Sequence, residues 1–142
     1  MIKLNVTSVM VLDQEEALDF YVNKLGLEKA QDIHQGLFRW LTVRVPGNPE
    51  IEIFLQEPGP PVQDEATAVQ LRELIAKGAM GGLVFQTDDT WGLYEKLKAR
   101  GVTDFTQEPI DHAYGTDMGI RDPFGNAIRI LQPARSAQAA TA

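Results

Sequence analysis

The feature that most constrains the fold is an internal repeat of about 76 residues. In each half, an apolar, β-branched run precedes an acidic residue, a helix-like segment and three further strand-like runs. Asp13 and Asp89 lie 76 positions apart, and the runs 51–53 and 128–130 lie 77 positions apart. One such half leaves part of its sheet uncovered, so we expect the two halves to fold together.

The first half predicts a helix followed by a group of strands. Asp13 precedes Glu16 by three residues, the spacing of a capping box, and Gly26 follows the helix. The apolar helix face recurs at spacings of three and four and contains Ala17, Leu18, Tyr21, Val22 and Leu25. Strands are predicted at residues 4–12, 28–33, 37–45 and 51–56, with a turn at 46–49.

The second half repeats this plan after a connector. The connector starts with the proline-rich run 58–61, continues as a predicted helix at 64–77 and ends near Gly78. A helix is then predicted after Asp89, and strands are predicted at 82–87, 104–106, 116–121 and 127–132. The predicted organisation is a first module at 1–56, a connector at 57–79, a second module at 80–133 and a disordered tail at 134–142, within one domain overall.

Composition excludes several classes of function. The chain carries a formal net charge of −7 and has a pI near 4.7, so its surface repels nucleic acid and anionic membranes. It has no cysteine, which excludes disulfides, thiolate metal sites and cysteine nucleophiles. No apolar run reaches the roughly 20 residues of a membrane span, and no signal-peptide pattern opens the chain. We therefore expect a soluble, cytoplasmic protein.

Two motifs strengthen the repeat and point to a known family. The first helix contains Asp13-x-x-x-Ala17-x-x-Phe20-Tyr21 and ends at Leu25-Gly26-Leu27, and the last strand follows Arg121-Asp122-Pro123-Phe124-Gly125-Asn126. With the double module, residues 2–132 resemble the vicinal oxygen chelate superfamily, which includes glyoxalases, bleomycin-resistance proteins and extradiol dioxygenases. The resemblance implies an α+β fold of two tandem βαβββ modules, a curved mixed sheet around a cleft, and a homodimer.

In this family, metal ligands come from the first and last strands of each module. The resemblance assigns these four positions to Val6, Glu52, Gly82 and Arg129. A divalent ion needs three or four oxygen or nitrogen donors, but only Glu52 offers one, and Arg129 is permanently charged. We therefore expect no metal or other cofactor. The alternative is a divalent metal that Glu52 binds together with other ligands, such as His112.

Arg129 has three open interpretations. It could form a structural ion pair with Glu52 inside the cleft. It could instead bind a carboxylate or phosphate of a small ligand, together with Arg44. It could also point into solvent.

An aromatic pocket is predicted from the alternation of residues 37–45. Leu41, Val43 and Val45 are expected to face the helix, so the intervening residues face the cleft. With neighbouring strands, this gives a mostly apolar ligand-binding set: Met10, Phe38, Trp40, Thr42, Arg44, Phe54 and Leu131. The alternative is that Trp40 lies in the core or against a second subunit. His34 and His112 are expected in exposed turns at the rim, and no catalytic residue can be assigned.

Three functions remain open. The residues favour a metal-free protein that binds a small, partly apolar or anionic molecule, as bleomycin-resistance proteins do. The first alternative is a divalent-metal-dependent lyase, isomerase or dioxygenase of the same superfamily. The second is an acid–base enzyme without metal. The expected partners are the small molecule and a second copy of the chain.

Overall fold

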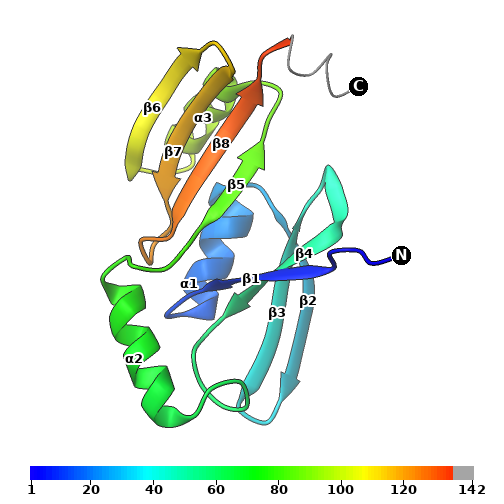
Figure 1. Ribbon diagram of the computed structural model, residues 1–142, viewed down its shortest axis with the longest axis vertical. Coiled ribbons are helices and arrows are strands. Elements are labelled where there is room, and N and C mark those ends of the chain that lie inside the picture. Colours follow the sequence, from blue (N-terminus) through cyan, green and yellow to red (C-terminus); the bar gives the residue numbers. More distant parts are fainter. Residues whose placement is uncertain (136–142) are drawn as a thin grey trace. The chain divides into compact units, whose positions relative to one another are not determined.

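The computed structural model describes residues 1–135 as two compact units, each with its own four-stranded sheet (Figure 1). Unit 1 contains residues 1–81 and 123–126, and unit 2 contains residues 82–122 and the chain from Ala127 onward. Each unit has the element order of a βαβββ module, so the predicted α+β class and tandem modules are confirmed. No helix within residues 1–135 is long and apolar enough to span a membrane.

Unit 1 has the strand order β1-β4-β3-β2, with β1 parallel to β4 and the other neighbours antiparallel. Its elements are β1 Val6–Met10, α1 Gln14–Leu18 with a π-helical continuation Asp19–Lys24, β2 Glu28–Gln35, β3 Phe38–Val45, β4 Asn48–Gln56 and α2 Glu65–Ala76.

Unit 2 has the corresponding strand order β5-β8-β7-β6, again with one parallel pair, β5 with β8. In Figure 1, α3 lies behind this sheet, and it contacts β6, β7 and β8. The elements of unit 2 are β5 Leu83–Gln86, α3 Thr90–Ala99, β6 Phe105–His112, β7 Gly115–Arg121 and β8 Ala127–Pro133.

An aspartate caps the start of α1, of α2 and of α3. The Asp13 carboxylate accepts a hydrogen bond from the backbone N–H of Glu16 at 3.0 Å, as the capping-box spacing predicts. Asp64 and Asp89 accept the equivalent bonds at the starts of α2 and α3. The caps at Asp13 and Asp89 determine where α1 begins after β1 and where α3 begins after β5.

The first helix differs from the prediction in its second half. Asp19–Lys24 forms a π-helix, in which the N–H of Leu25 donates to the carbonyl of Phe20, five residues earlier. Phe20 and Tyr21 are adjacent in sequence, yet both are buried, with ring centroids 5.1 Å apart. The wider turn brings both rings onto the core side, which a regular 3.6-residue period does not predict.

The cores of the two units consist mostly of aliphatic residues from the sheet faces that the helices cover. In unit 1, the buried set includes Val9, Val11, Ala17, Tyr21, Leu41, Val43, Ile53 and Leu55. In unit 2, it includes Leu97, Val102, Met118, Ile120, Ile128 and Ile130. Leu41 and Val43 are therefore buried as the alternation predicts, whereas Val45, at the end of β3, is only half-buried.

Strand β6 is much longer than the predicted strand at 104–106. Pro109 interrupts the apolar pattern, but β6 lies at the edge of its sheet, where a missing N–H donor leaves no partner unsatisfied. The pairing with β7 shifts register between Gln107 and Ile110 to accommodate this segment. β4 likewise begins at Asn48, inside the predicted turn.

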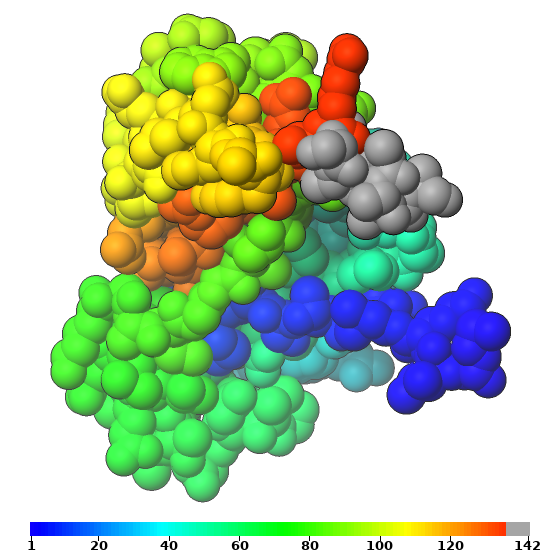
Figure 2. All heavy atoms as spheres, turned by 45° about the horizontal axis from the view of Figure 1, so that its top comes forward, coloured from blue at the N-terminus to red at the C-terminus, as the bar shows by residue number. Residues whose placement is uncertain are grey.

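The turn before the last strand belongs to unit 1. Gly125 has φ +80°, which favours glycine, and the Asn126 side-chain amide donates to the carbonyl of Met10 at 2.8 Å. At the start of the chain, residues 1–5 are exposed, and the N-terminal segment is the blue arm in Figure 2. Ala134 still donates to the Tyr114 carbonyl, whereas residues 136–142 of the predicted tail lie outside the described part of the chain.

Candidate functional site

Unit 1 carries an aromatic face on the side of its sheet opposite the apolar core. Trp40 and Phe54 are in ring contact, with centroids 4.4 Å apart and an interplanar angle of 34°. Phe38 adds an edge-on contact with Phe54 at 6.1 Å. Phe54 is buried, while Phe38 and Trp40 keep part of their surface exposed. We call Phe38, Trp40 and Phe54 the aromatic face.

A carboxylate lies next to the aromatic face. Glu52 is half-buried, and its Oε1 accepts hydrogen bonds from the Thr42 hydroxyl at 2.6 Å and the Gln31 amide at 2.7 Å. These two bonds, with a smaller contribution from the charge of Arg44, hold the pKa of Glu52 below its usual value. The group is therefore an ionised acceptor at neutral pH.

The remaining sequence-predicted residues of unit 1 divide into two groups. Met10 and Val6 lie in β1 and share a face with their register partners in β4, Gln56 and Glu52. Arg44, by contrast, is 39% exposed and donates to Glu28 at 3.3 Å, so its nearest acidic partner is in β2.

A pocket of about 190 Å³ adjoins the aromatic face where β4 ends. Phe38 and Phe54 line one side, and Gln14, Pro60 and Arg72 contribute to the remaining wall. This pocket was not predicted from the sequence, because its wall combines the proline-rich connector with residues of α1, β3 and β4 that are distant in sequence.

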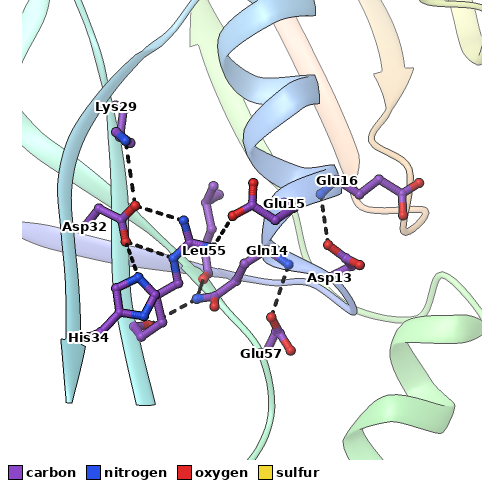
Figure 3. Close-up of polar contacts among 10 residues, drawn as sticks. Asp13, Gln14, Glu15, Glu16, Lys29, Asp32, His34, Leu55 and Glu57 are labelled. Atoms are coloured by element: carbon purple, nitrogen blue, oxygen red, sulfur yellow. Dashed lines mark hydrogen bonds and ion pairs between the residues drawn. The ribbon is translucent and has the colours of Figure 1, made fainter. Parts of the chain in front are cut away.

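Gln14 and Arg39 of the pocket wall belong to a cluster of hydrogen bonds and ion pairs that was not predicted from the sequence (Figure 3). Arg39 makes two 2.8 Å bonds to the Asp32 carboxylate and also pairs with Glu15 of α1. The bond from Arg39 lowers the pKa of Asp32 to about 2, and Asp32 in turn raises the pKa of Arg39. Gln14 donates to the backbone carbonyls of Arg39 and Leu55, which ties α1 to both central strands.

Unit 2 carries charged residues on the corresponding face. Arg129 donates to the Asp117 carboxylate at 2.6 Å and to the Gln107 side chain at 3.1 Å. Burial raises the pKa of Asp117, but the bonds from Arg129 and Gln107 outweigh this effect and leave it below its usual value. The acidic partner of Arg129 is therefore Asp117 rather than the Glu52 considered in the sequence analysis. Because Asp117 offsets the charge of Arg129, this pairing weakens the interpretation of Arg129 as an anion clamp.

His112 lies closer to this cluster than the sequence indicated. It ends β6, and its Nε2 is 3.0 Å from the other carboxylate oxygen of Asp117. Its ring stacks on Tyr114 with centroids 4.6 Å apart, and the Tyr114 hydroxyl donates to Asp117. His34 also lies in a strand, one residue before the end of β2, where its side chain is 66% exposed and its Nε2 lies 3.3 Å from Asp32. Both histidines thus lie at strand ends beside an aspartate.

Strand register changes the predicted correspondence between the modules. Phe54 pairs with Thr42, and Arg129 pairs with Gly119 at the equivalent point of its sheet. Arg44 of β3 and Arg121 of β7 also occupy equivalent positions. Arg44 pairs with Glu52, and Arg121 pairs with Ala127. The last strands thus correspond at a spacing of 75 residues rather than 77, and the structural counterpart of Arg129 is Phe54.

The four family ligand positions do not supply a metal site. Val6 lies opposite Glu52, but Arg129 lies opposite Val84 rather than Gly82. A Cβ on Gly82 would come within 1.6 Å of the Ala127 carbonyl oxygen, so that position has no room for a ligating side chain. Within residues 1–135, no group of three or more histidine or acidic side chains is arranged to hold a metal ion. The donor set therefore does not fit a divalent ion.

Comparison with known sequences identifies the family. Residues 3–130 match the Glyoxalase/Bleomycin resistance protein/Dioxygenase superfamily. The uncharacterized protein YurT of Bacillus subtilis (strain 168) is 35% identical over 130 residues, which cover 92% of this chain and 98% of YurT.

Solved structures give the same result. UcmS2 is 41% identical and has a TM-score of 0.84, with 92% of this chain and 98% of UcmS2 covered. TnmS3, an antibiotic binding protein from Streptomyces sp. CB03234, is 29% identical and has a TM-score of 0.73, with 94% and 98% covered. The repeat, the fold and these matches agree, and the chain belongs to the glyoxalase/bleomycin resistance protein/dioxygenase superfamily.

Proposed function

We propose that this protein binds a small, partly apolar molecule through the aromatic face and does so without a metal and without converting the molecule. The observation that carries the proposal is the contact of Trp40 with Phe54 on a sheet face that keeps Phe38 and Trp40 partly exposed. Phe54 supports Trp40 from below, and the exposed parts of Trp40 and Phe38 offer an apolar surface on which a ring system can stack.

Similarity to an antibiotic binding protein supports a binding role. TnmS3 shares 29% of its sequence with this chain across nearly the full length of both. A binding or resistance-type role requires only that the molecule is held, and the aromatic face supplies the necessary apolar area.

The donor chemistry supports the metal-free part of the proposal. Glu52 is the only family ligand position with a donor side chain, and its Oε1 already accepts bonds from Thr42 and Gln31. A metal-dependent lyase or dioxygenase would need further donors beside Glu52, such as imidazole or carboxylate groups.

Fluorescence tests the proposal directly. The Trp91→Phe variant makes Trp40 the only tryptophan, because the chain has two. Titration of this variant with a panel of aromatic antibiotics, including bleomycin, is expected to change Trp40 emission in a saturable way for at least one compound. Chromatography of the recovered compound is expected to show it unchanged. If calorimetry confirms that a compound binds but the emission of Trp40 does not change, the binding site lies elsewhere.

Truncation of the face provides the matched comparison. Trp40→Leu is expected to weaken binding of that compound at least tenfold, by loss of a stacking partner worth about 1.4 kcal/mol. Trp91→Leu is the control, because Trp91 lies on α3 in the other unit and is 49% exposed. Equal loss in both variants would contradict the proposal.

A further inference from the structure

We propose that Glu52 selects the ligand class, so that the aromatic face binds planar aromatic amines in their protonated form rather than aromatic carboxylates. This inference rests on the proposed function and adds to it the charge of the ligand. Glu52, which the family resemblance assigns to a metal, then accepts a hydrogen bond from an organic cation.

The hydrogen bonds of Glu52 leave one oxygen available. Both donors, the Thr42 hydroxyl and the Gln31 amide, bond to Oε1. Within residues 1–135, no donor of the protein bonds to Oε2. The two bonds fix the orientation of the carboxylate, so Oε2 can accept a bond from a ligand without breaking an existing one.

Strand geometry places this oxygen within reach of a stacked ligand. Glu52 and Phe54 are two residues apart in β4 and therefore share one face, at a spacing of about 7 Å along the strand. Thr42, which bonds to Glu52, is also the register partner of Phe54. A ring that stacks on the exposed part of Trp40 and extends past Phe54 can therefore carry an amino group that points toward Glu52.

The local charge favours a cation. Arg44 is the nearest positive group on this part of the face, and its bond goes to Glu28 rather than to Glu52. Glu28, Arg44 and Glu52 together sum to a net charge of −1, from one positive and two negative groups. A protonated amine also gains from the exposed face of the Trp40 ring, whereas a carboxylate is repelled by both that ring and Glu52.

Two matched probes measure this preference. 9-Aminoacridine is planar and protonated at neutral pH, and 9-acridinecarboxylate has the same ring system with an acidic group. We expect the Trp91→Phe protein to bind 9-aminoacridine at least tenfold more tightly than 9-acridinecarboxylate, the difference between a charge-assisted hydrogen bond and none.

Glu52→Gln tests the role of the carboxylate itself. The two donors still require a carbonyl oxygen in place of Oε1, so the amide NH2 occupies the place of Oε2 and presents a donor to the ligand. The variant is expected to lose the tenfold preference while binding the carboxylate probe at least as well as before. Glu73→Gln removes the same charge from an exposed position on α2 and is expected to keep the preference.

The outcomes separate this inference from the proposed function. If both probes bind with equal affinity, or if Glu52→Gln keeps the preference, the inference is wrong while binding at the aromatic face stands. If Glu73→Gln loses the preference as fully as Glu52→Gln, the effect comes from the overall charge of −7, and the inference is also wrong. If neither probe binds the wild-type face and aromatic antibiotics are equally silent, both fail.

Discussion

The two sheets have the same strand order but carry different chemistry at corresponding positions. Trp40 and Asp117 both pair with an isoleucine of the neighbouring edge strand, Ile33 and Ile110. Phe54 and Arg129 both pair with the residue two positions further along the central strand. Unit 1 therefore places two aromatic rings where unit 2 places an ion pair.

This difference shows which parts of the repeat the fold constrains. The buried faces of both sheets are aliphatic, because each must pack on its own helix. The opposite faces carry no such requirement, so one can offer an apolar surface and the other a hydrogen-bonded network. In unit 1, Arg39 of β3 is half-buried and pairs instead with Glu15 of α1 and Asp32 of β2.

Truncation of Phe54 is expected to have the largest effect on stability. Phe54 is 5% exposed, so Phe54→Ala should lower the free energy of unfolding by about 3–4 kcal/mol. Arg129→Ala, at the corresponding position of unit 2, should cost less, because the Arg129 side chain is 39% exposed. Urea unfolding of both variants checks the order. Equal losses of unfolding free energy would show that Phe54 and Arg129 contribute equally to stability and would contradict this order.

Removal of the Asp117 carboxylate is the next largest expected effect. Asp117→Ala removes the carboxylate that accepts bonds from Arg129 and Gln107 and should cost about 2–3 kcal/mol, the usual figure for a buried pair reduced for solvent screening. Asp88→Ala, an exposed control in the same unit, should cost less than about 0.5 kcal/mol. A loss for Asp117→Ala no greater than that of the control would mean that the network in unit 2 contributes little.

Acid titration tests the ion pair of unit 1. The pKa of Asp32 falls from 3.8 to about 2 in the folded protein, so its contribution is present above pH 3.8 and is lost as the pH falls toward 2. Allowing for partial solvent screening, we expect the pair to account for about 1–2 kcal/mol of this loss. Unfolding measured from pH 5 to pH 2 should therefore show a smaller acid loss in Asp32→Asn than in the wild type. The same acid loss in both would contradict the assignment.

The smallest expected effect on stability comes from Gly119→Ala, because Gly119 lies against the side chain of Arg129. A Cβ on Gly119 would come within 2.6 Å of the Arg129 guanidinium and 2.4 Å of the Thr106 hydroxyl. Gly119→Ala should therefore cost about 1 kcal/mol, because the arginine must move. The cost should be smaller in an Arg129→Ala background, and a double-mutant cycle measures this coupling. Additive losses would show that Arg129 does not lie against Gly119.

The sequence was sufficient for the fold, because its main signals are local and occur twice. Caps such as Asp13 and Asp89 and the alternation of Leu41 with Val43 each determine a piece of structure without reference to distant residues. The π-helical segment was missed because the requirement to bury both Phe20 and Tyr21 outweighs the regular helical period.

The site was less predictable, because it depends on strand register and on partners that are distant in sequence. Alternation placed Trp40 and Phe54 on one face correctly, and their ring contact follows from it. The match of Arg129 with Glu52 was wrong by two residues, because apolar residues recur every second position in β4 and β8, and this alternation does not determine which of them lies opposite a given residue of β3 or β7. The cluster of Arg39 with Asp32 needs contacts across a hairpin and had no local signal.

One measurement tests the difference between the two faces most directly. Chemical-shift changes of the ¹⁵N-labelled protein with 9-aminoacridine report binding along the whole chain. The account predicts that the largest saturable shifts fall in residues 38–42 and 52–56, around the aromatic face. Shifts centred on Asp117 and Arg129, with residues 38–42 and 52–56 unchanged, would contradict it.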